Sequence, residues 1–154
     1  MKKLFVYYSL SGNGEAVAQA MAEKGYELRR AVPVKPMPKS FAGQILKGGF
    51  RAGIGAKEKL ADFDFSAEGY DEIVFGSPIW NGRIVPAINT ALCGMKTEGK
   101  TVSFALWSAS GEAKPALKRI AKEYPGRKTA VLKNPKDNPD ELGKLGKLGK
   151  LGDL

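Results

Sequence analysis

The chain has 154 residues, of which 43% are hydrophobic, so it is long enough to form one domain with a sizeable buried core. It contains no histidine, which excludes a Ser-His-Asp or Cys-His nucleophile and any histidine-ligated metal site; we expect no metal site. The net charge of +9 favours acidic partners, but the basic residues are scattered, so we expect no nucleic-acid binding. No apolar run is long enough to predict a membrane span.

The first half of the chain begins with an apolar run at residues 4–8, which predicts a strand buried on both faces. The Ala-rich segment 15–24 predicts a helix with one apolar face. Residues 26–34 predict a second strand, which a group of prolines ends. Residues 39–69 form a long Gly-rich connection, in which we expect one short helix at 40–46.

The second half continues to alternate strands and helices. The expected strands are residues 71–77, 101–107 and 128–133, and the expected helices are residues 84–95 and 113–124. Alternation of this kind predicts a parallel sheet covered by helices on both faces, so the fold class is α/β, with a three-layer α/β/α sandwich. We expect one domain over residues 1–154.

Two features of the chain are interpreted as structural. The lone Cys93 falls in an apolar helical stretch, where we expect it to be buried; a single cysteine also fits a reducing, cytoplasmic location. The C-terminal tail repeats Gly-Lys-Leu three times from Gly143. Leucines three residues apart drift around an α-helix, and each glycine costs about 1 kcal/mol relative to alanine. We therefore expect a marginal helix from residue 139, frayed from about residue 143 and most of all beyond about Leu145.

The loops that follow Tyr8, Phe75 and Trp107 form the candidate site, because ligands of parallel α/β sheets bind at the carboxyl ends of the strands. All three loops are rich in small and hydroxyl residues. The first loop also opens a helix, whose unpaired N–H groups lie at the positive end of the helix dipole. This loop therefore predicts an anion pocket, with phosphate as its usual occupant.

Two nucleotide motifs compete with this interpretation. A literal P-loop match at residues 94–101 stands after a helix and before a strand, which is the reverse of the required order, so we interpret it as an ordinary turn. Gly12 and Gly14 begin a dinucleotide fingerprint, but Val17 takes the third glycine position. The dinucleotide fingerprint also expects an acidic residue at the end of the second strand, where this chain has Arg29 and Arg30. Arginines at that position would suit a 2′-phosphate. The hydroxyls of the first loop favour a phosphate monoester over the pyrophosphate of a dinucleotide, because a terminal phosphate offers more oxygens to hydrogen-bond donors.

Three segments resemble the flavodoxin-like proteins that bind flavin mononucleotide (FMN). Residues 7–13 are similar to the phosphate loop of that family, residues 76–80 to its ring-contacting loop and residues 108–111 to its second ring loop. The resemblance extends from residue 2 to about residue 142. It implies a flavodoxin-like, five-stranded parallel sheet of order 2-1-3-4-5 and one non-covalently bound FMN. The FMN-binding residues that it implies are Ser9, Leu10, Ser11, Gly12, Asn13, Gly14, Ser77, Pro78, Ile79, Trp80, Asn81, Gly82, Ser108, Ala109, Ser110 and Gly111.

Within this site, two positions have specific expected roles. Trp80 is expected to stack on the flavin ring. Gly14 stands where the phosphate loop of the family usually has a hydroxyl residue, so one phosphate hydrogen bond is expected to be missing. The substitution Gly14→Thr is therefore expected to tighten FMN binding.

Three functions remain open at this point. The first is electron transfer or small-molecule oxidoreduction through FMN, with a redox partner protein or a small-molecule acceptor and with no side chain acting as acid, base or nucleophile. The second is an NAD(P)H-dependent quinone or flavin reductase. The third is a binding module that keeps the fold without the cofactor. The positive charge of the chain favours an acidic partner.

Overall fold

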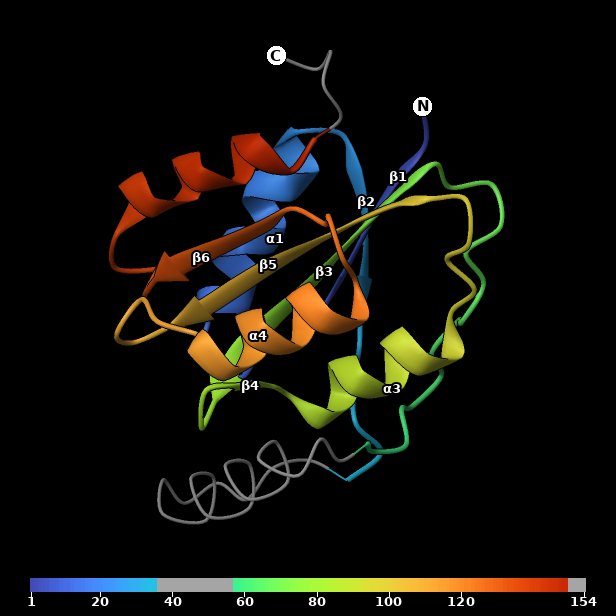
Figure 1. Cartoon of the computed structure of the whole chain (residues 1–154), viewed down its shortest axis with the longest axis horizontal. Helices are drawn as coiled ribbons and strands as arrows, with labels where there is room; N and C mark the ends of the chain where they lie inside the picture. The colour runs from blue at the N-terminus through green and yellow to red at the C-terminus, as the bar shows by residue number, and fades with distance from the viewer. Residues whose placement is uncertain (36–56, 150–154) are drawn as a thin grey trace.

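Strand β3 (Glu72–Trp80) lies at the centre of the sheet in the computed structural model, which describes residues 1–35 and 57–149. It pairs in parallel with β1 (Lys3–Tyr7) on one side and with β5 (Thr101–Ser108) on the other. The sheet ends in β2 (Tyr26–Arg30) beside β1 and in β6 (Thr129–Lys133) beside β5. The order β2-β1-β3-β5-β6 confirms the expected order of the five parallel strands (Figure 1).

Helices cover both faces of the sheet, which confirms the three-layer sandwich (Figure 1). Helices α3 (Pro86–Gly94) and α4 (Lys114–Glu123) pack on one face. Helix α1 (Asn13–Glu23) and the 3₁₀ helix η1 (Pro139–Leu148) pack on the other. The central strands are mostly apolar because both of their faces are buried; Glu72, Ser77 and Ser103 are their buried polar residues. Among the described residues, none of the helices combines the length and apolar character needed to cross a membrane.

Strand β2 ends at Arg30, before the expected end at residue 34, and the chain departs again from the expected elements after residue 77. Strand β3 continues through Trp80 because it forms an antiparallel hairpin with β4 (Arg83–Ile84). The hairpin turn is Asn81-Gly82, with φ values of 51° and 75°, a combination that Asn-Gly supplies readily in two-residue hairpins. Residue 84 belongs to this hairpin, so α3 starts at Pro86. The short helix expected at 40–46 lies outside the described residues.

The prediction that Cys93 is buried is wrong, because its side chain is exposed. Helix α3 presents Ile88, Ala91 and Leu92 to the core. With 3.6 residues per turn, the next position turns away from these three and faces outward. The apolar stretch was long enough to hide which of its residues lies on the outer face.

The tail repeat forms a 3₁₀ helix, so the predicted drift of its leucines is wrong. A 3₁₀ helix has three residues per turn, and residues three apart are eclipsed. Leu142, Leu145 and Leu148 therefore share one face, and the last two are 2% and 0% exposed. The Ser103 hydroxyl also donates a hydrogen bond to the Leu148 carbonyl oxygen, at 3.2 Å. The packed part of the tail thus extends to Leu148.

We predict that Leu148→Ala lowers the free energy of unfolding by about 2–4 kcal/mol, as removal of a fully buried leucine side chain does elsewhere. The neighbouring Lys147 is exposed, so Lys147→Ala is the matched control and should change stability by less than about 0.5 kcal/mol. Urea denaturation followed by circular dichroism measures both. Equal stability of the two variants would mean that the tail frays before Leu148, as its glycines suggest.

Candidate functional site

Four loops meet at the edge of the sheet where the parallel strands end. They are the β1–α1 loop, the β3–β4 hairpin with its extension to α3, the β5–α4 loop and the β6–η1 loop (residues 134–138). The first three were expected from the sequence. The fourth was missed, although it follows a parallel strand and the same topological rule applies to it.

The β1–α1 loop leaves the N-terminus of α1 open. Gly12 is the N-cap residue, and its φ of 86° is a left-handed conformation that glycine adopts without strain. No described side chain caps the helix. The N–H groups of Asn13, Gly14 and Glu15 are in the first turn, where a helix offers no internal acceptor. The loop therefore presents backbone donors at the positive end of a helix dipole, which is the geometry of an anion site.

Gly14 is required by the packing of this loop. A Cβ atom on Gly14 would lie 2.3 Å from Ser9 Cβ and 2.9 Å from the Tyr8 carbonyl oxygen. The space in which a threonine side chain would stand is already filled by Ser9. A threonine at this position would displace the loop itself, so this packing speaks against the expectation that Gly14→Thr tightens FMN binding.

Glu15, which lies beside the anion site, is neutralised by its neighbours. Its carboxylate accepts a hydrogen bond from the Ser9 hydroxyl, and its Oε1 lies 3.3 Å from Arg30 Nη1. Arg30 also donates to the Ser9 carbonyl oxygen, at 3.2 Å. The single proton of the Ser9 hydroxyl is committed to Glu15, so Ser11, which is exposed, is the loop hydroxyl that is available to a ligand.

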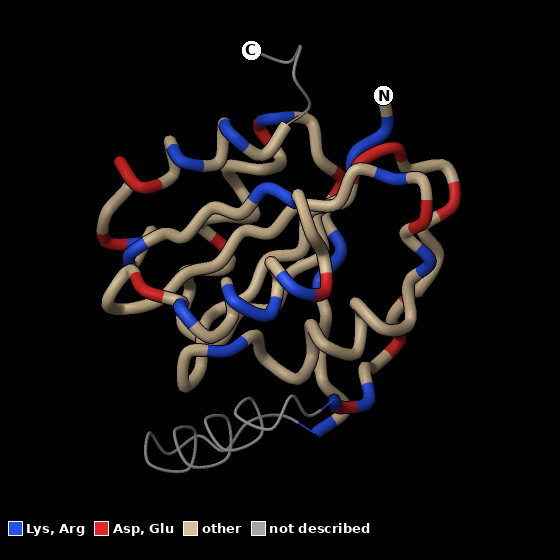
Figure 2. The backbone as a smooth tube through the Cα atoms, viewed as in Figure 1, with Lys and Arg blue, Asp and Glu red and all other residues tan. Residues whose placement is uncertain are grey.

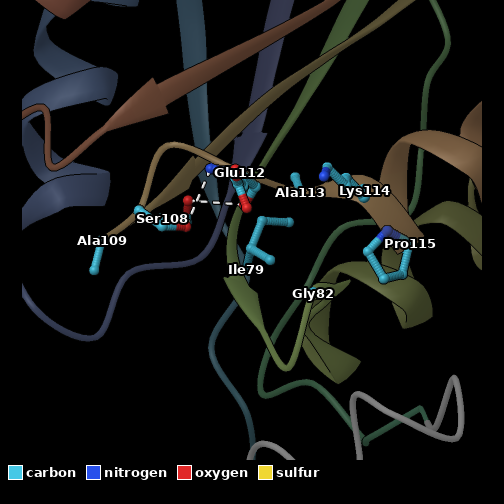
Figure 3. A pocket seen from close by; sticks show the side chains of 9 residues that line it. Ile79, Gly82, Ser108, Ala109, Glu112, Ala113, Lys114 and Pro115 are labelled. Atoms are coloured by element: carbon cyan, nitrogen blue, oxygen red, sulfur yellow. Dashed lines mark hydrogen bonds between the residues drawn. The ribbon is translucent and has the colours of Figure 1, made fainter.

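A pocket of about 430 Å³ separates the β3–β4 hairpin from the β5–α4 loop (Figure 3). Ile79 and Gly82 form one wall. The lining residues of the other wall are Ser108, Ala109, Ser110, Glu112, Ala113, Lys114 and Pro115. The walls meet where the Gly82 carbonyl oxygen accepts a hydrogen bond from the Ala116 N–H, at 2.9 Å. Five of the residues expected from the sequence are thus in this pocket.

The hydroxyls of the β5–α4 loop hold the loop together. The Ser108 hydroxyl donates to the Glu112 carbonyl oxygen at 2.9 Å, and the Glu112 N–H donates to the Ser110 hydroxyl at 3.2 Å (Figure 3). These bonds close the loop on itself, so its shape is fixed before a ligand arrives. Glu112 and the start of α4 were not expected from the sequence, because no motif marks them.

Other expected residues lie beside the pocket. Ser77 is fully buried, and its hydroxyl oxygen accepts a hydrogen bond from the Val85 N–H at 3.1 Å, so it supports the start of α3. Trp80 packs edge-on against Tyr8, with ring centroids 5.6 Å apart. Burial of its side chain raises the pKa of Tyr8 to about 12. The contact of Trp80 with a flavin ring stays a prediction. Pro78, Asn81 and Gly111 are likewise outside the lining of this pocket.

The β6–η1 loop connects the two halves of the site. The Asn134 N–H donates to the Ser108 carbonyl oxygen at 3.1 Å, and the Lys136 N–H donates to Asn13 Oδ1 at 3.0 Å. One short loop therefore holds the β5–α4 loop and the start of α1 in a fixed relation. The P-loop match at residues 94–101 lies at the opposite edge, between the end of α3 and the start of β5, and is confirmed as a turn.

We predict that Gly14→Ala lowers the free energy of unfolding by about 1–3 kcal/mol, because its methyl group would overlap Ser9. The second change Ser9→Gly removes that overlap, so the double variant should recover part of the loss. Thermal unfolding of the single and double variants measures this coupling. Additive effects of the two changes would show that Ser9 does not occupy the space beside Gly14.

Comparison with curated proteins identifies a longer relative, which this chain matches over part of its length. An NAD(P)H dehydrogenase (quinone) of Caulobacter vibrioides is 29% identical over 139 residues, which are 85% of this chain and 62% of the relative. The chain thus spans less than two thirds of that protein.

Solved structures share the fold. A protein of Bacteroides eggerthii that is provisionally named a flavoprotein matches with a TM-score of 0.75 and 22% identity. The match covers 96% of this chain and 97% of the B. eggerthii chain. A flavoprotein of Lactobacillus acidophilus, solved in complex with FMN, matches with a TM-score of 0.66 and 23% identity, over 90% and 97% of the two chains. The sequence model of the flavodoxin family matches residues 2–141. The chain therefore belongs to the flavodoxin family.

Proposed function

We propose that the chain binds one FMN across the carboxyl edge of the sheet and takes part in electron transfer or small-molecule oxidoreduction. The observation that supports this best is the pairing of an uncapped helix N-terminus with a pocket at the same edge. The first feature suits a phosphate, and the second suits a flat apolar ring. The FMN complex of the L. acidophilus protein, whose fold is similar, supports the same cofactor.

The phosphate end of the proposed site fits a phosphate monoester. The first-turn N–H groups of α1 and the exposed Ser11 hydroxyl supply donors. Glu15 does not oppose the ligand with a free charge, because Arg30 pairs with it. A dianion would therefore meet backbone dipoles and a Glu15 carboxylate whose charge is offset by Arg30.

The ring end of the proposed site fits an isoalloxazine. Its volume of about 430 Å³ lies in the range of ordinary ligand pockets, roughly 300–1,000 Å³. Ile79, Ala109 and Pro115 provide apolar surface, and the internally bonded β5–α4 loop provides a rigid wall. FMN, when bound, would supply the redox chemistry, and these residues would orient it and exclude water from one face.

We predict that the purified chain, freed of any flavin, takes up one equivalent of FMN, and that Ala109→Glu weakens this binding at least about tenfold by placing a carboxylate at the ring wall. Ala121, exposed on α4, lies outside the pocket, so Ala121→Glu is the control with the same change of charge. Quenching of flavin fluorescence measures both. A wild-type chain that takes up no FMN would favour a cofactor-free binding module and contradict the proposal.

A second candidate function is an NAD(P)H-dependent quinone reductase. The relative from C. vibrioides, which is named for this activity, is the observation that favours it. Steady oxidation of NADH or NADPH by the FMN-loaded chain, accelerated by a water-soluble quinone, would establish the reductase. Absence of turnover with both nucleotides would favour the electron carrier.

The surface next to the pocket fits an acidic redox partner. Basic residues are spread over many elements, and several of them lie along helix α4 (Figure 2). Lys114, Lys118 and Lys122 are spaced four apart and therefore lie on one side of this helix. Glu123, the acid of α4, pairs with Arg119 at 3.0 Å. Leu117, on the same helix, is 37% exposed, so the basic surface of α4 also contains an apolar side chain.

We predict that Lys118→Glu slows electron exchange between the FMN-loaded chain and a small acidic iron–sulfur protein by about threefold to tenfold at low ionic strength. Lys147 is exposed on η1, so Lys147→Glu makes the same charge change away from α4. The difference between the variants should vanish in high salt, because exposed charges are then screened. Stopped-flow absorbance measures the rates. Equal slowing by both variants would indicate net charge rather than docking on α4.

A further inference from the structure

Lys136 places its ammonium group against the open N-terminus of α1. A Cβ atom on Gly12 would lie 3.3 Å from Lys136 Cδ and 3.5 Å from its Nζ, so the lysine side chain extends across this glycine. Gly12 is the N-cap residue of α1. The ammonium therefore lies beside the residue from which the proposed phosphate site begins.

The backbone of the β6–η1 loop fixes the position of this lysine. The Lys136 N–H donates to Asn13 Oδ1 at 3.0 Å, which ties the loop to the first residue of α1. The N–H groups of Asp137 and Asn138 donate to the Asn134 carbonyl oxygen at 3.0 and 2.9 Å, which closes the turn around Lys136. The side chain thus starts from a backbone that these hydrogen bonds hold in place, next to the N-terminus of α1.

The charge of Lys136 is available to a ligand. Its side chain is exposed, and among the ion pairs of the described residues none involves it. A cation at a helix N-terminus is unfavourable in itself, because it faces the positive end of the dipole. A bound dianion would remove this cost by accepting from both the ammonium and the first-turn N–H groups.

We propose that Lys136 is a phosphate-binding residue that makes this chain select the phosphorylated flavin over the same ring without phosphate. The inference rests on the proposed function. Ser9 cannot donate to the phosphate while its proton is held by Glu15, and Gly14 carries no hydroxyl. Lys136 supplies from the opposite end of the chain the donor that the β1–α1 loop lacks.

The test compares FMN with riboflavin, which has the same ring and no phosphate. Lys136→Gln removes the charge and keeps most of the side-chain length, and the bond from its backbone N–H to Asn13 needs no lysine. We expect this variant to bind FMN about tenfold more weakly, with riboflavin affinity changed less than about twofold. Lys136→Arg should restore FMN affinity to within about threefold, because it restores the cation.

Lys96→Gln is the matched control, since Lys96 is exposed at the opposite edge of the sheet, between α3 and β5, and the net charge changes equally. It should leave both affinities within about twofold. Inorganic phosphate should compete with FMN for the wild-type chain more strongly than for Lys136→Gln. Raising the salt concentration from about 20 to about 300 mM should weaken FMN binding more in the wild type than in the variant.

The outcomes separate the two proposals. If the wild type binds FMN and Lys136→Gln binds it equally tightly, the role of Lys136 is wrong and the FMN site stands. An equal loss of FMN and riboflavin affinity would also overturn that role, because it would show a disturbed loop rather than a lost phosphate contact. A wild-type chain that binds neither flavin overturns the proposed function and this inference with it.

Discussion

Parallel pairing of β3 with β1 and β5 is the constraint on which the site depends. It aligns Gly76 with Tyr7 on one side and with Ala105 on the other, so all three strands end at the same edge. Their loops then have to meet there. Because β3 runs on into a hairpin with β4, its end forms a wall facing the β5–α4 loop, and the space between becomes the pocket.

Charges at this edge come together from segments far apart in the sequence. Glu15 is paired with Arg30, whereas Lys136, from the loop after the last strand, adds positive charge at the N-terminus of α1 and leaves it to a ligand to balance. At Gly14 the loop is closely packed against Ser9 and leaves no room for a side chain. A proposed phosphate contact from a remote lysine is consistent with this packing, since a donor side chain has no space at Gly14.

Apolar runs and the alternation of strands and helices are strong signals, and they predicted the parallel sheet and the edge that holds the site. The strand order came from the resemblance to the flavodoxin-like proteins. Individual side chains were harder to predict. Ser77 supplies a hydroxyl in the expected motif, but its side chain is buried and accepts a hydrogen bond from the Val85 N–H. The tail leucines were judged by the period of an α-helix, whereas the 3₁₀ helix has a period of three that matches the repeat. Lys136 carries no motif, and only the topology of its loop could have indicated it.

A crystal structure of the chain grown with FMN is the decisive measurement. We expect the phosphate at the N-terminus of α1, within hydrogen-bond distance of Lys136 Nζ and the first-turn N–H groups. We expect the flavin ring between Ile79 and Gly82 on one side and residues 108–110 on the other. An FMN bound with its phosphate elsewhere, or crystals that contain no flavin after growth at saturating FMN, would contradict these expectations.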